Sequence, residues 1–382
     1  MISSTRRSAA FQPFPPPLSS SSPTPGTRFR VRITDVAFGG DGIARLEDGR
    51  VLFTPFVATG EEVEVEIVSV KKNFAMGRMI SVLTPSADRV APVCPYFGDC
   101  GGCRYQHLRY EAQLALKESQ LAATLRRIGQ AELGDVPVKP IIASPQAYEY
   151  RNRITVHLKD GAVGFHAAGG HRLVEVNRCE IAAPAVNALL FELATTRRRR
   201  REDGHRTLRS DRTHRFFHQA NDAAAALMLA HVMALATASG GSLVDAYCGA
   251  GWFVKALRSH FSQCIGIEWD TYAIEAARIG AETNERYLEG DVALLLPQAL
   301  AATGGAETTV ILDPPAEGLA HAVTDAVVDA RPHRVIYVSC HPATLARDLA
   351  RLKLGGYRID AVTPIDMFPQ TAEIEAVALL TR

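Results

Sequence analysis

The chain has 382 residues, 47% hydrophobic and 22% charged, a balance that is typical of globular proteins and provides apolar material for two or three domains. No apolar run approaches the ~20 residues that a membrane-spanning helix needs, which argues against a helical membrane protein. The net charge of +1 neither favours nor excludes a nucleic-acid partner, because a balanced total can hide a local basic face.

Residues 1–27 are rich in serine and proline. Such a segment buries too little apolar surface to order itself, so we predict a disordered leader. The segment lacks the continuous apolar stretch of a signal peptide, and a cytoplasmic location is therefore expected. A mis-chosen start codon would also produce such a leader.

Residues 28–84 predict a small all-β domain. The segments Arg28–Ile33 and Glu62–Ile67 alternate polar and apolar side chains with the period of two that a half-buried strand shows. Glycine-rich turns between them favour several short strands, and hence a compact barrel of OB-like character. Its arginines and lysines suit a nucleic-acid backbone, although a solvated strand face would carry the same charges.

Residues 88–215 predict a central domain that begins with three closely spaced cysteines. From residue 107 apolar side chains recur at spacings near 3.6, which predicts a helix over 107–137 that packs on the last domain. A β-rich stretch, Tyr150–Ile181, contains a fourth cysteine. The domain ends in an arginine-dense segment, Arg197–Arg215, which indicates a flexible loop that can meet a polyanion.

Residues 216–382 alternate predicted strands with helical segments, which indicates an α/β domain on a doubly wound, mostly parallel sheet. Its buried strands are predicted at Ser242–Cys248, Cys264–Glu268, Thr309–Asp313 and Arg334–Val338. Two alternating segments without an intervening helix, Tyr357–Thr363 and Glu373–Thr381, end the chain. They predict an antiparallel hairpin at the edge of the sheet.

The first buried strand of this sheet is followed by Gly249-Ala250-Gly251, at the edge where such sheets bind ligands. Glycines let the backbone approach a ligand, and Glu268, at the end of the next strand, can accept hydrogen bonds from ribose hydroxyls. These residues alone predict a nucleoside-containing cofactor. The alternative is a tight strand-to-helix turn beside a solvated carboxylate.

Two further motifs follow strands that end at the same crevice, Asp313-Pro314-Pro315 and Ser339-Cys340-His341-Pro342. With them, residues 28–382 resemble the RNA uracil-C5 methyltransferase family, in particular the 23S ribosomal RNA type with a TRAM domain and an iron–sulfur cluster. The other motifs that carry the resemblance are the cysteine spacing, Tyr150-Arg151-Asn152-Arg153, Phe216-Phe217 with Gln219 and Asn221, Asp245-Ala246-Tyr247-Cys248-Gly249, and Glu375.

The resemblance implies a Rossmann-like class I methyltransferase domain over 216–382, preceded by an OB-like (TRAM) barrel and a central iron–sulfur and RNA-binding domain. It implies S-adenosylmethionine as the cofactor and RNA as the substrate, and we expect a monomer that does not bind membranes. It places catalysis on Cys340 and Glu375. It places cofactor binding on Gln219, Tyr247, Gly249, Trp252, Glu268, Asp291 and Asp313.

The chemistry explains why a cysteine and a carboxylate are needed. C5 of uracil becomes nucleophilic only after a thiolate has added at C6, and a base must then remove the C5 proton. Cys340 follows a central strand, and Pro342 predicts a helix start whose N–H groups favour the thiolate. Glu373 and Glu375 share one face of their strand, and the family position favours Glu375. Without the family, these residues would be a core cysteine and a solvated carboxylate.

The seven cysteines are an odd number in a chain without an export signal, which argues against disulfides and for metal-binding or catalytic thiols. Cys248 and Cys264 are predicted as buried sheet residues. Four others are available to one metal site: Cys94, Cys100, Cys103 and Cys179. Tetrahedral zinc and an iron–sulfur cluster both suit four thiolates, and the resemblance implies a [4Fe–4S] cluster.

A base inside a helix cannot present C6 to a buried thiol, so the target uridine must be unpaired or flipped out. The Arg197–Arg215 segment and the N-terminal barrel are the candidate RNA contacts. Phe165, Phe216 and Phe217 could stack on bases, although core positions are the alternative.

Four positions depart from the family's usual residues, and they predict altered substrate geometry or weaker catalysis. They are Ala316 for an arginine, His341 for an asparagine, Trp252 for a smaller residue and Glu373 for a histidine. Three hypotheses remain: a ribosomal RNA uracil methyltransferase, a transfer RNA uracil methyltransferase, and a cluster-containing RNA-binding protein without turnover. The TRAM-like barrel and the four cysteines favour the ribosomal RNA enzyme over the transfer RNA enzyme. The presence of Asp313, Cys340 and Glu375 together argues against the third hypothesis.

Overall fold

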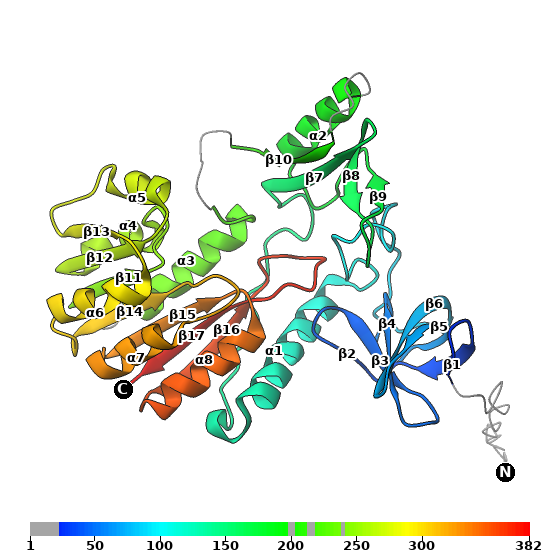
Figure 1. Ribbon diagram of the computed structural model, residues 1–382, viewed down its shortest axis with the longest axis horizontal. Helices are drawn as coiled ribbons and strands as arrows, with labels where there is room; N and C mark the ends of the chain where they lie inside the picture. The colour runs from blue at the N-terminus through cyan, green and yellow to red at the C-terminus, as the bar shows by residue number, and fades with distance from the viewer. Residues whose placement is uncertain (1–22, 198–202, 212–217, 238–240) are drawn as a thin grey trace, which may run out of the picture. The chain divides into compact units, whose positions relative to one another are not determined.

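The computed structural model describes residues 23–197, 203–211, 218–237 and 241–382. The chain divides into two compact units, one holding residues through 37 with 41–87 and the other holding 38–40 with 88–382 (Figure 1). In the described part of the chain, no helix is both long and apolar enough to cross a membrane.

The N-terminal unit is a six-stranded sheet in the order β1-β5-β6-β4-β3-β2. Its strands are β1 (Arg28–Arg32), β2 (Asp35–Val36), β3 (Asp41–Arg45), β4 (Val51–Pro55), β5 (Glu62–Val70) and β6 (Phe74–Thr84). The predicted alternation is present in β5, where Val63, Val65 and Ile67 are buried. Gly26 and Thr27, which the sequence placed in the leader, hydrogen-bond to Ile67, so the domain begins before residue 28. The rest of the predicted leader, 1–22, lies outside the described residues.

The central part of the second unit is a four-stranded sheet in the order β10-β7-β8-β9, which α2 covers on one face. Its elements are β7 (Arg153–Lys159), β8 (Ala162–His166), β9 (Leu173–Glu175), α2 (Pro184–Arg197) and β10 (Gly204–Arg209). The prediction of a flexible loop over Arg197–Arg215 is wrong for Gly204–Arg209, because these residues pair with β7. Residues 198–202 and 212–217, with Phe216 and Phe217, lie outside the described residues. Phe165 packs against the core of this sheet.

The largest sheet has seven strands in the order β13-β12-β11-β14-β15-β17-β16. Its strands are β11 (Ser242–Ala246), β12 (Gln263–Glu268), β13 (Glu285–Glu289), β14 (Thr308–Leu312), β15 (Arg334–Ser339), β16 (Arg358–Ile365) and β17 (Glu375–Thr381). The pairs from β13 through β15 are parallel, whereas β17 runs antiparallel to both β15 and β16. The predicted parallel sheet with an antiparallel terminal hairpin is confirmed.

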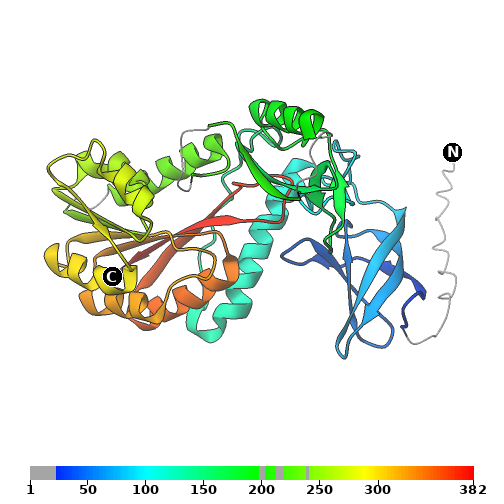
Figure 2. The same ribbon diagram turned by 45° about the horizontal axis from the view of Figure 1, so that its top comes forward.

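Helices cover both faces of this sheet (Figure 2). The first face packs against α1 (Tyr110–Leu133), α6 (Val292–Ala302), α7 (His321–Ala330) and α8 (Pro342–Leu354). The second packs against α3 (Asp222–Ala236), α4 (Trp252–Leu257) and α5 (Thr271–Arg278), and the short helix η1 (Arg258–His260) follows α4. Helix α1 precedes the central sheet in the chain, but its Leu121 and Leu125 lie in the core of the large sheet.

Candidate active site

The turn between β11 and α4 forms one wall of a cavity. Tyr247 has a φ of 71° and Gly251 a φ of 79°. A Cβ at Gly251 would lie 2.7 Å from the hydroxyl of Tyr287, so only glycine fits there. A positive φ is uncommon for a bulky residue such as Tyr247, and such strain often marks functional sites.

The cavity beside this turn has a volume of about 660 Å³, within the range of small-molecule and cofactor sites. Five of the residues predicted to bind the cofactor line it: Gln219, Tyr247, Gly249, Trp252 and Asp313. Asn221 is buried, and its side-chain oxygen accepts a hydrogen bond from Ala224 N–H as the N-cap of α3. It thereby fixes the backbone two residues after Gln219.

Glu268 and Asp291 were also predicted to bind the cofactor, but they are not among the residues that line this cavity. The Glu268 carboxylate accepts hydrogen bonds from Gly249 N–H at 3.0 Å and from Trp269 N–H at 2.9 Å. It therefore holds the glycine turn to the end of β12. Asp291 is exposed, and it caps α6 by accepting from Ala293 N–H at 2.8 Å.

Two carboxyl groups at the ends of neighbouring strands have raised pKa values. Burial raises the pKa of Asp313, just after β14, to about 7. Burial, followed by the charge of Asp313, raises the pKa of Asp245 in β11 well above its usual range. This end of the sheet therefore favours neutral carboxyls or a nearby cation.

Cys340 is half-buried between the end of β15 and the start of α8. Helix α8 begins at Pro342, as predicted. Burial, followed by the charges of Glu375 and Asp313, raises the pKa of Cys340 to about 11. A backbone hydrogen bond at Cys340 lowers the pKa, but the effects of burial and of the two carboxylates are larger.

Glu375 is the first residue of β17 and only 5% exposed. The antiparallel register pairs Ser339 with Ala376, which puts Cys340 and Glu375 at opposed positions where β15 and β17 end and begin. Burial, followed by the charges of Asp313 and Glu373, raises the pKa of Glu375 well above its usual range. Glu373 is exposed and precedes the strand, so the predicted strand start at Glu373 is wrong.

His341 and Ala316, two of the four positions that depart from the family's usual residues, have structural roles. The imidazole of His341 is the N-cap of α8, because its Nδ1 accepts a hydrogen bond from Thr344 N–H. An asparagine would cap in the same way, so the helix start survives the change. Ala316 is exposed, and its carbonyl accepts from the hydroxyl of Thr344 at 3.1 Å, which holds the loop after β14 to α8.

The loop over residues 366–374, between β16 and β17, is held by α1 and extends away from the sheet (Figure 1). Lys117 and Asp366 form an ion pair at 2.7 Å with both side chains fully buried. The side-chain amide of Gln113 donates to the side-chain oxygen of Gln370 at 3.0 Å. The carbonyl of Gln370 accepts from the backbone N–H groups of Arg104 and Tyr105. Sequence patterns gave no indication of these contacts, since the partners lie more than 200 positions apart.

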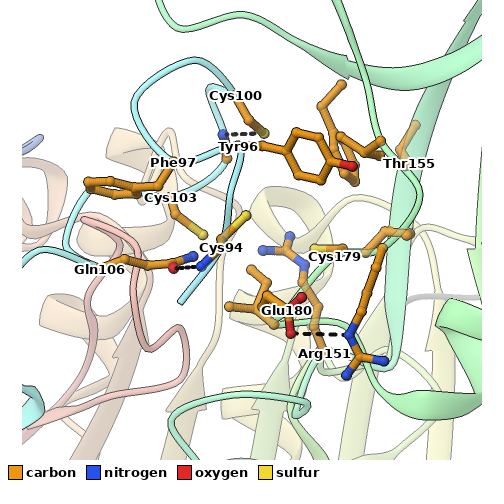
Figure 3. Close-up of a pocket in the computed structure, with 16 residues that line it drawn as sticks. Cys94, Tyr96, Phe97, Cys100, Cys103, Gln106, Arg151, Thr155, Cys179 and Glu180 are labelled. Atoms are coloured by element: carbon orange, nitrogen blue, oxygen red, sulfur yellow. Dashed lines mark hydrogen bonds and ion pairs between the residues drawn. The ribbon is translucent and has the colours of Figure 1, made fainter. Parts of the chain in front are cut away.

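A second cavity, of about 250 Å³, is lined by all four predicted metal ligands (Figure 3). These ligands are Cys94, Cys100, Cys103 and Cys179. One of them, Cys103, directly precedes Arg104. Burial raises the pKa of Cys103 to about 12 and that of Cys179 to about 11. In the part of the chain that the structure describes, no three His, Cys, Asp or Glu side chains are close enough to hold a single metal ion as they stand. Cys264 in β12 and Cys248, two residues after β11, are both buried, as predicted.

Two protein families match the chain. Residues 23–80 match the TRAM domain, and residues 203–288 and 303–382 match tRNA (uracil-5-)-methyltransferase. An RNA methyltransferase of Thermosynechococcus vestitus is 31% identical over 444 residues, covering 93% of this chain and 98% of the relative. An RNA methyltransferase of Bdellovibrio bacteriovorus is 33% identical over 390 residues, covering 94% and 97%.

A solved structure shares the fold of most of the chain. The tRNA (uracil-54, C5)-methyltransferase of Pyrococcus abyssi, determined in complex with S-adenosyl-L-homocysteine, is similar with a TM-score of 0.69. The sequences are 24% identical, and the similarity covers 92% of this chain and 100% of that chain.

Proposed function

We propose that this chain, which belongs to the family of RNA methyltransferases that act on uracil C5, methylates a uridine of 23S ribosomal RNA through Cys340. The TRAM domain and the four cysteines that line one cavity are the features that favour ribosomal over transfer RNA. The observation that carries the mechanism is the opposed placement of Cys340 and Glu375 at the ends of β15 and β17. A nucleophile and a proton acceptor must both reach one pyrimidine ring, and this placement supports those two roles.

The 660 Å³ cavity is the proposed site of S-adenosylmethionine, which supplies an electrophilic methyl group when bound. Gln219, Tyr247, Gly249, Trp252 and Asp313 would hold it. The donor set fits this cofactor, because a buried acidic group such as Asp313 is stabilised in its charged form by a cation, and a sulfonium is cationic.

In the proposed first step the thiol of Cys340 loses its proton and its sulfur bonds to C6 of uracil. The electron pair of the C5–C6 double bond then makes C5 nucleophilic toward the methyl group. Because burial raises the pKa of Cys340 to about 11, the proposed attack needs bound substrate and cofactor to stabilise the thiolate.

In the proposed last step Glu375 takes the proton from C5. The electron pair of that C–H bond re-forms the C5–C6 double bond and expels the sulfur of Cys340 as a thiolate. The thiol proton released to solvent in the first step is regained by the thiolate at the end, so over the cycle one methyl group replaces the C5 proton, which leaves through Glu375 to solvent. Burial raises the pKa of Glu375, so its carboxylate is a stronger proton acceptor than an exposed one, and it must be in its charged form when it takes the C5 proton.

We propose that the cysteine cavity holds a [4Fe–4S] cluster. The fit rests on the donor set, since four thiols from Cys94, Cys100, Cys103 and Cys179 line one cavity, and iron–sulfur clusters take four thiolates. Such a cluster would tie the loop around Cys94–Cys103 to Cys179, and the proposed chemistry needs no electron transfer. Zinc is the alternative occupant of four thiolates.

Substitutions at the two proposed catalytic residues test the mechanism. Cys340→Ala is expected to abolish methylation of RNA, and methylation at the rate of the unaltered protein would contradict the mechanism. Glu375→Gln is expected to accumulate a covalent protein–RNA adduct, visible as a shifted band on denaturing gels. Glu373→Gln is the matched control, because Glu373 is exposed and outside β17, and it should accumulate no adduct.

The RNA class is tested by nucleoside mass spectrometry of ribosomal and transfer RNA from a strain that lacks the gene. Loss of 5-methyluridine from 23S ribosomal RNA alone is the expected result. Its loss from transfer RNA alone would replace the proposed substrate, and no loss from either would contradict the function.

A further inference from the structure

The loop that joins β16 to β17 is long for a hairpin. Ile365 pairs with Glu375, so residues 366–374 form the loop, whereas hairpin loops commonly have about two to five residues. Most of its side chains are buried, among them Met367, Gln370 and Ile374, so the loop is packed rather than loose. Long loops inside compact domains are usually functional. Glu375, the proposed proton acceptor, lies at the end of this one.

The middle of the loop is a tight turn with an unusual residue in it. The backbone N–H of Thr371 donates to the carbonyl of Phe368 at 3.2 Å, Pro369 follows Phe368, and Gln370 has a φ of 69°. Proline second and a positive φ third are the features of a type II turn, which normally takes glycine or asparagine at the third position. A glutamine there is strained, and such strain persists only where the surroundings hold the residue.

Gln113 of α1 holds Gln370 through a reciprocal pair of hydrogen bonds. The side-chain amide of Gln113 donates to the side-chain oxygen of Gln370 at 3.0 Å, and its own oxygen accepts from the backbone N–H of Gln370 at 3.1 Å. The side-chain amide of Gln370 donates in turn to the carbonyl of Ala147 at 3.4 Å. Both glutamines are buried. Glycine would remove the strain at position 370 but would lose the side-chain bonds, which explains the glutamine.

The turn is also held by its carbonyl groups. The four consecutive carbonyls of residues 367–370 each accept a hydrogen bond from a different segment of the chain. The donors are, in order, the side chains of Asn221, Lys117 and Tyr150 and the backbone N–H groups of Arg104 and Tyr105. The turn is therefore the point where α1, the N-cap of α3 and the chain after Cys103 meet.

A short packed segment leads from the turn to Glu375. Thr371 and Ile374 are buried, and the backbone N–H of Glu373 donates to the hydroxyl of Thr371 at 3.3 Å. Close packing leaves such a segment little freedom to adjust. The position of the turn therefore sets the position of Glu375, which lies opposite Cys340 where β17 begins.

We propose that Gln370 is a positioning residue, which through its pair with Gln113 holds the start of β17 so that Glu375 can reach the C5 proton. The proposal rests on the proposed function and adds to it a residue that does not touch the substrate. Only the last step of the cycle uses Glu375. Loss of the pair therefore slows removal of the C5 proton and leaves the attack by Cys340 and the methyl transfer in place, because a small misplacement of a reacting group has a large effect on rate.

Gln113→Leu tests the pair, since it removes both bonds to Gln370 and leaves the residues of the turn unchanged. We expect kcat to fall by about tenfold and the covalent protein–RNA adduct to accumulate on denaturing gels. The value of kcat/KM for RNA should change less than about twofold, because it reports the steps up to the irreversible methyl transfer. An unchanged kcat would overturn the proposal, as would a lower kcat without adduct.

Two buried tyrosines provide a matched and milder pair of substitutions. Tyr150 donates its hydroxyl to the carbonyl of Pro369 at 2.9 Å, and Tyr357 donates to that of Pro332 at 3.0 Å, away from the turn. Tyr150→Phe should lower kcat by about threefold with adduct, and Tyr357→Phe should do neither. Equal effects in both variants would mean a general loss of stability and would overturn the proposal. Each change removes one oxygen atom, so this pair decides the matter if Gln113→Leu does not fold.

Amide hydrogen exchange tests the link without any catalysis. In Gln113→Leu, exchange in a peptide covering residues 371–376 should be faster by about tenfold, whereas exchange in β12 should not change. Unchanged exchange over 371–376 would overturn the proposal. The proposed function fails separately, if the unaltered protein transfers no methyl group to RNA and forms no adduct, and the exchange comparison still tests the Gln113–Gln370 pair in that case.

Discussion

The cysteine cavity and the cofactor cavity are both lined by half-buried acidic groups, but the groups differ in kind. In the first, burial raises the pKa of thiols such as Cys103 and Cys179. In the second, it raises the pKa of carboxyls such as Asp313. Both cavities therefore favour a cation, which the proposals supply as iron in one and as a sulfonium in the other. Raised pKa values alone do not tell such sites apart, whereas donor chemistry does.

The two cavities also differ in how the chain builds them. The cofactor cavity lies at the ends of parallel strands, where the fold brings residues of successive motifs together. The cysteine cavity joins an irregular loop to Cys179, more than 70 positions later. The loop over 366–374 links both, because Gln370 accepts from the backbone of Arg104, next to Cys103, and the same loop leads into Glu375.

The largest expected effect is on the occupant of the cysteine cavity. Anaerobically purified protein is expected to contain iron, and Cys179→Ser should lose it, because the proposed cluster takes all four thiolates. Cys264→Ser is the matched control, since Cys264 is buried within strand β12 of the large sheet and outside the cavity. Iron content and the visible absorption spectrum measure the difference. Zinc without iron in the unaltered protein would refute the cluster, and equal iron in both variants would refute its site.

A second effect concerns the loop that links the cavities. Lys117→Met leaves Asp366 buried without its counter-charge, and this should lower the free energy of unfolding by about 3–5 kcal/mol. Chemical denaturation measures the loss. The double substitution Lys117→Met with Asp366→Leu removes both charges and should recover most of it. If the single and double variants are equally unstable, packing rather than charge holds the loop.

A third and smaller effect distinguishes Cys340 from an ordinary thiol. With a pKa of about 11, its thiolate fraction at pH 8 is roughly a hundredfold below that of a free cysteine. Alkylation by iodoacetamide, followed by peptide mass spectrometry, should be correspondingly slow and should rise about tenfold per pH unit up to pH 10. Alkylation at pH 7 as fast as that of glutathione would contradict the raised pKa.

The smallest effect is a pH-dependent change in stability at Asp313. Its folded pKa, about 7, is above the unfolded value of about 3.9, so the folded state binds more protons and loses stability as pH rises between these values. Asp313→Asn removes this loss. The Tm of the variant minus that of the unaltered protein should therefore be about 2–4 °C larger at pH 8 than at pH 5. Thermal unfolding at the two pH values measures it, and an equal gain at both would contradict the shift.

Local patterns were sufficient to predict most of the fold. Buried strands of the large sheet were recognisable from continuous apolar runs, and the terminal hairpin from the missing helix. Strand β13, Glu285–Glu289, was missed because charged residues occupy most of it and only Tyr287 is buried. Strand β10 was missed because its arginines resemble a solvated loop, although Leu208 packs against the core of its sheet.

The sequence by itself determined which side chains could do chemistry here: a cysteine, a carboxylate, a glycine turn and four further thiols in a recognisable order. Only the tertiary structure decided that Cys340 opposes Glu375, that Glu268 holds the glycine turn, and that Lys117 anchors the loop before Glu375. The reason is physical. Residue types set the available chemistry locally, but burial and pairing depend on contacts between segments far apart in the chain, and these contacts set the charges that the chemistry uses.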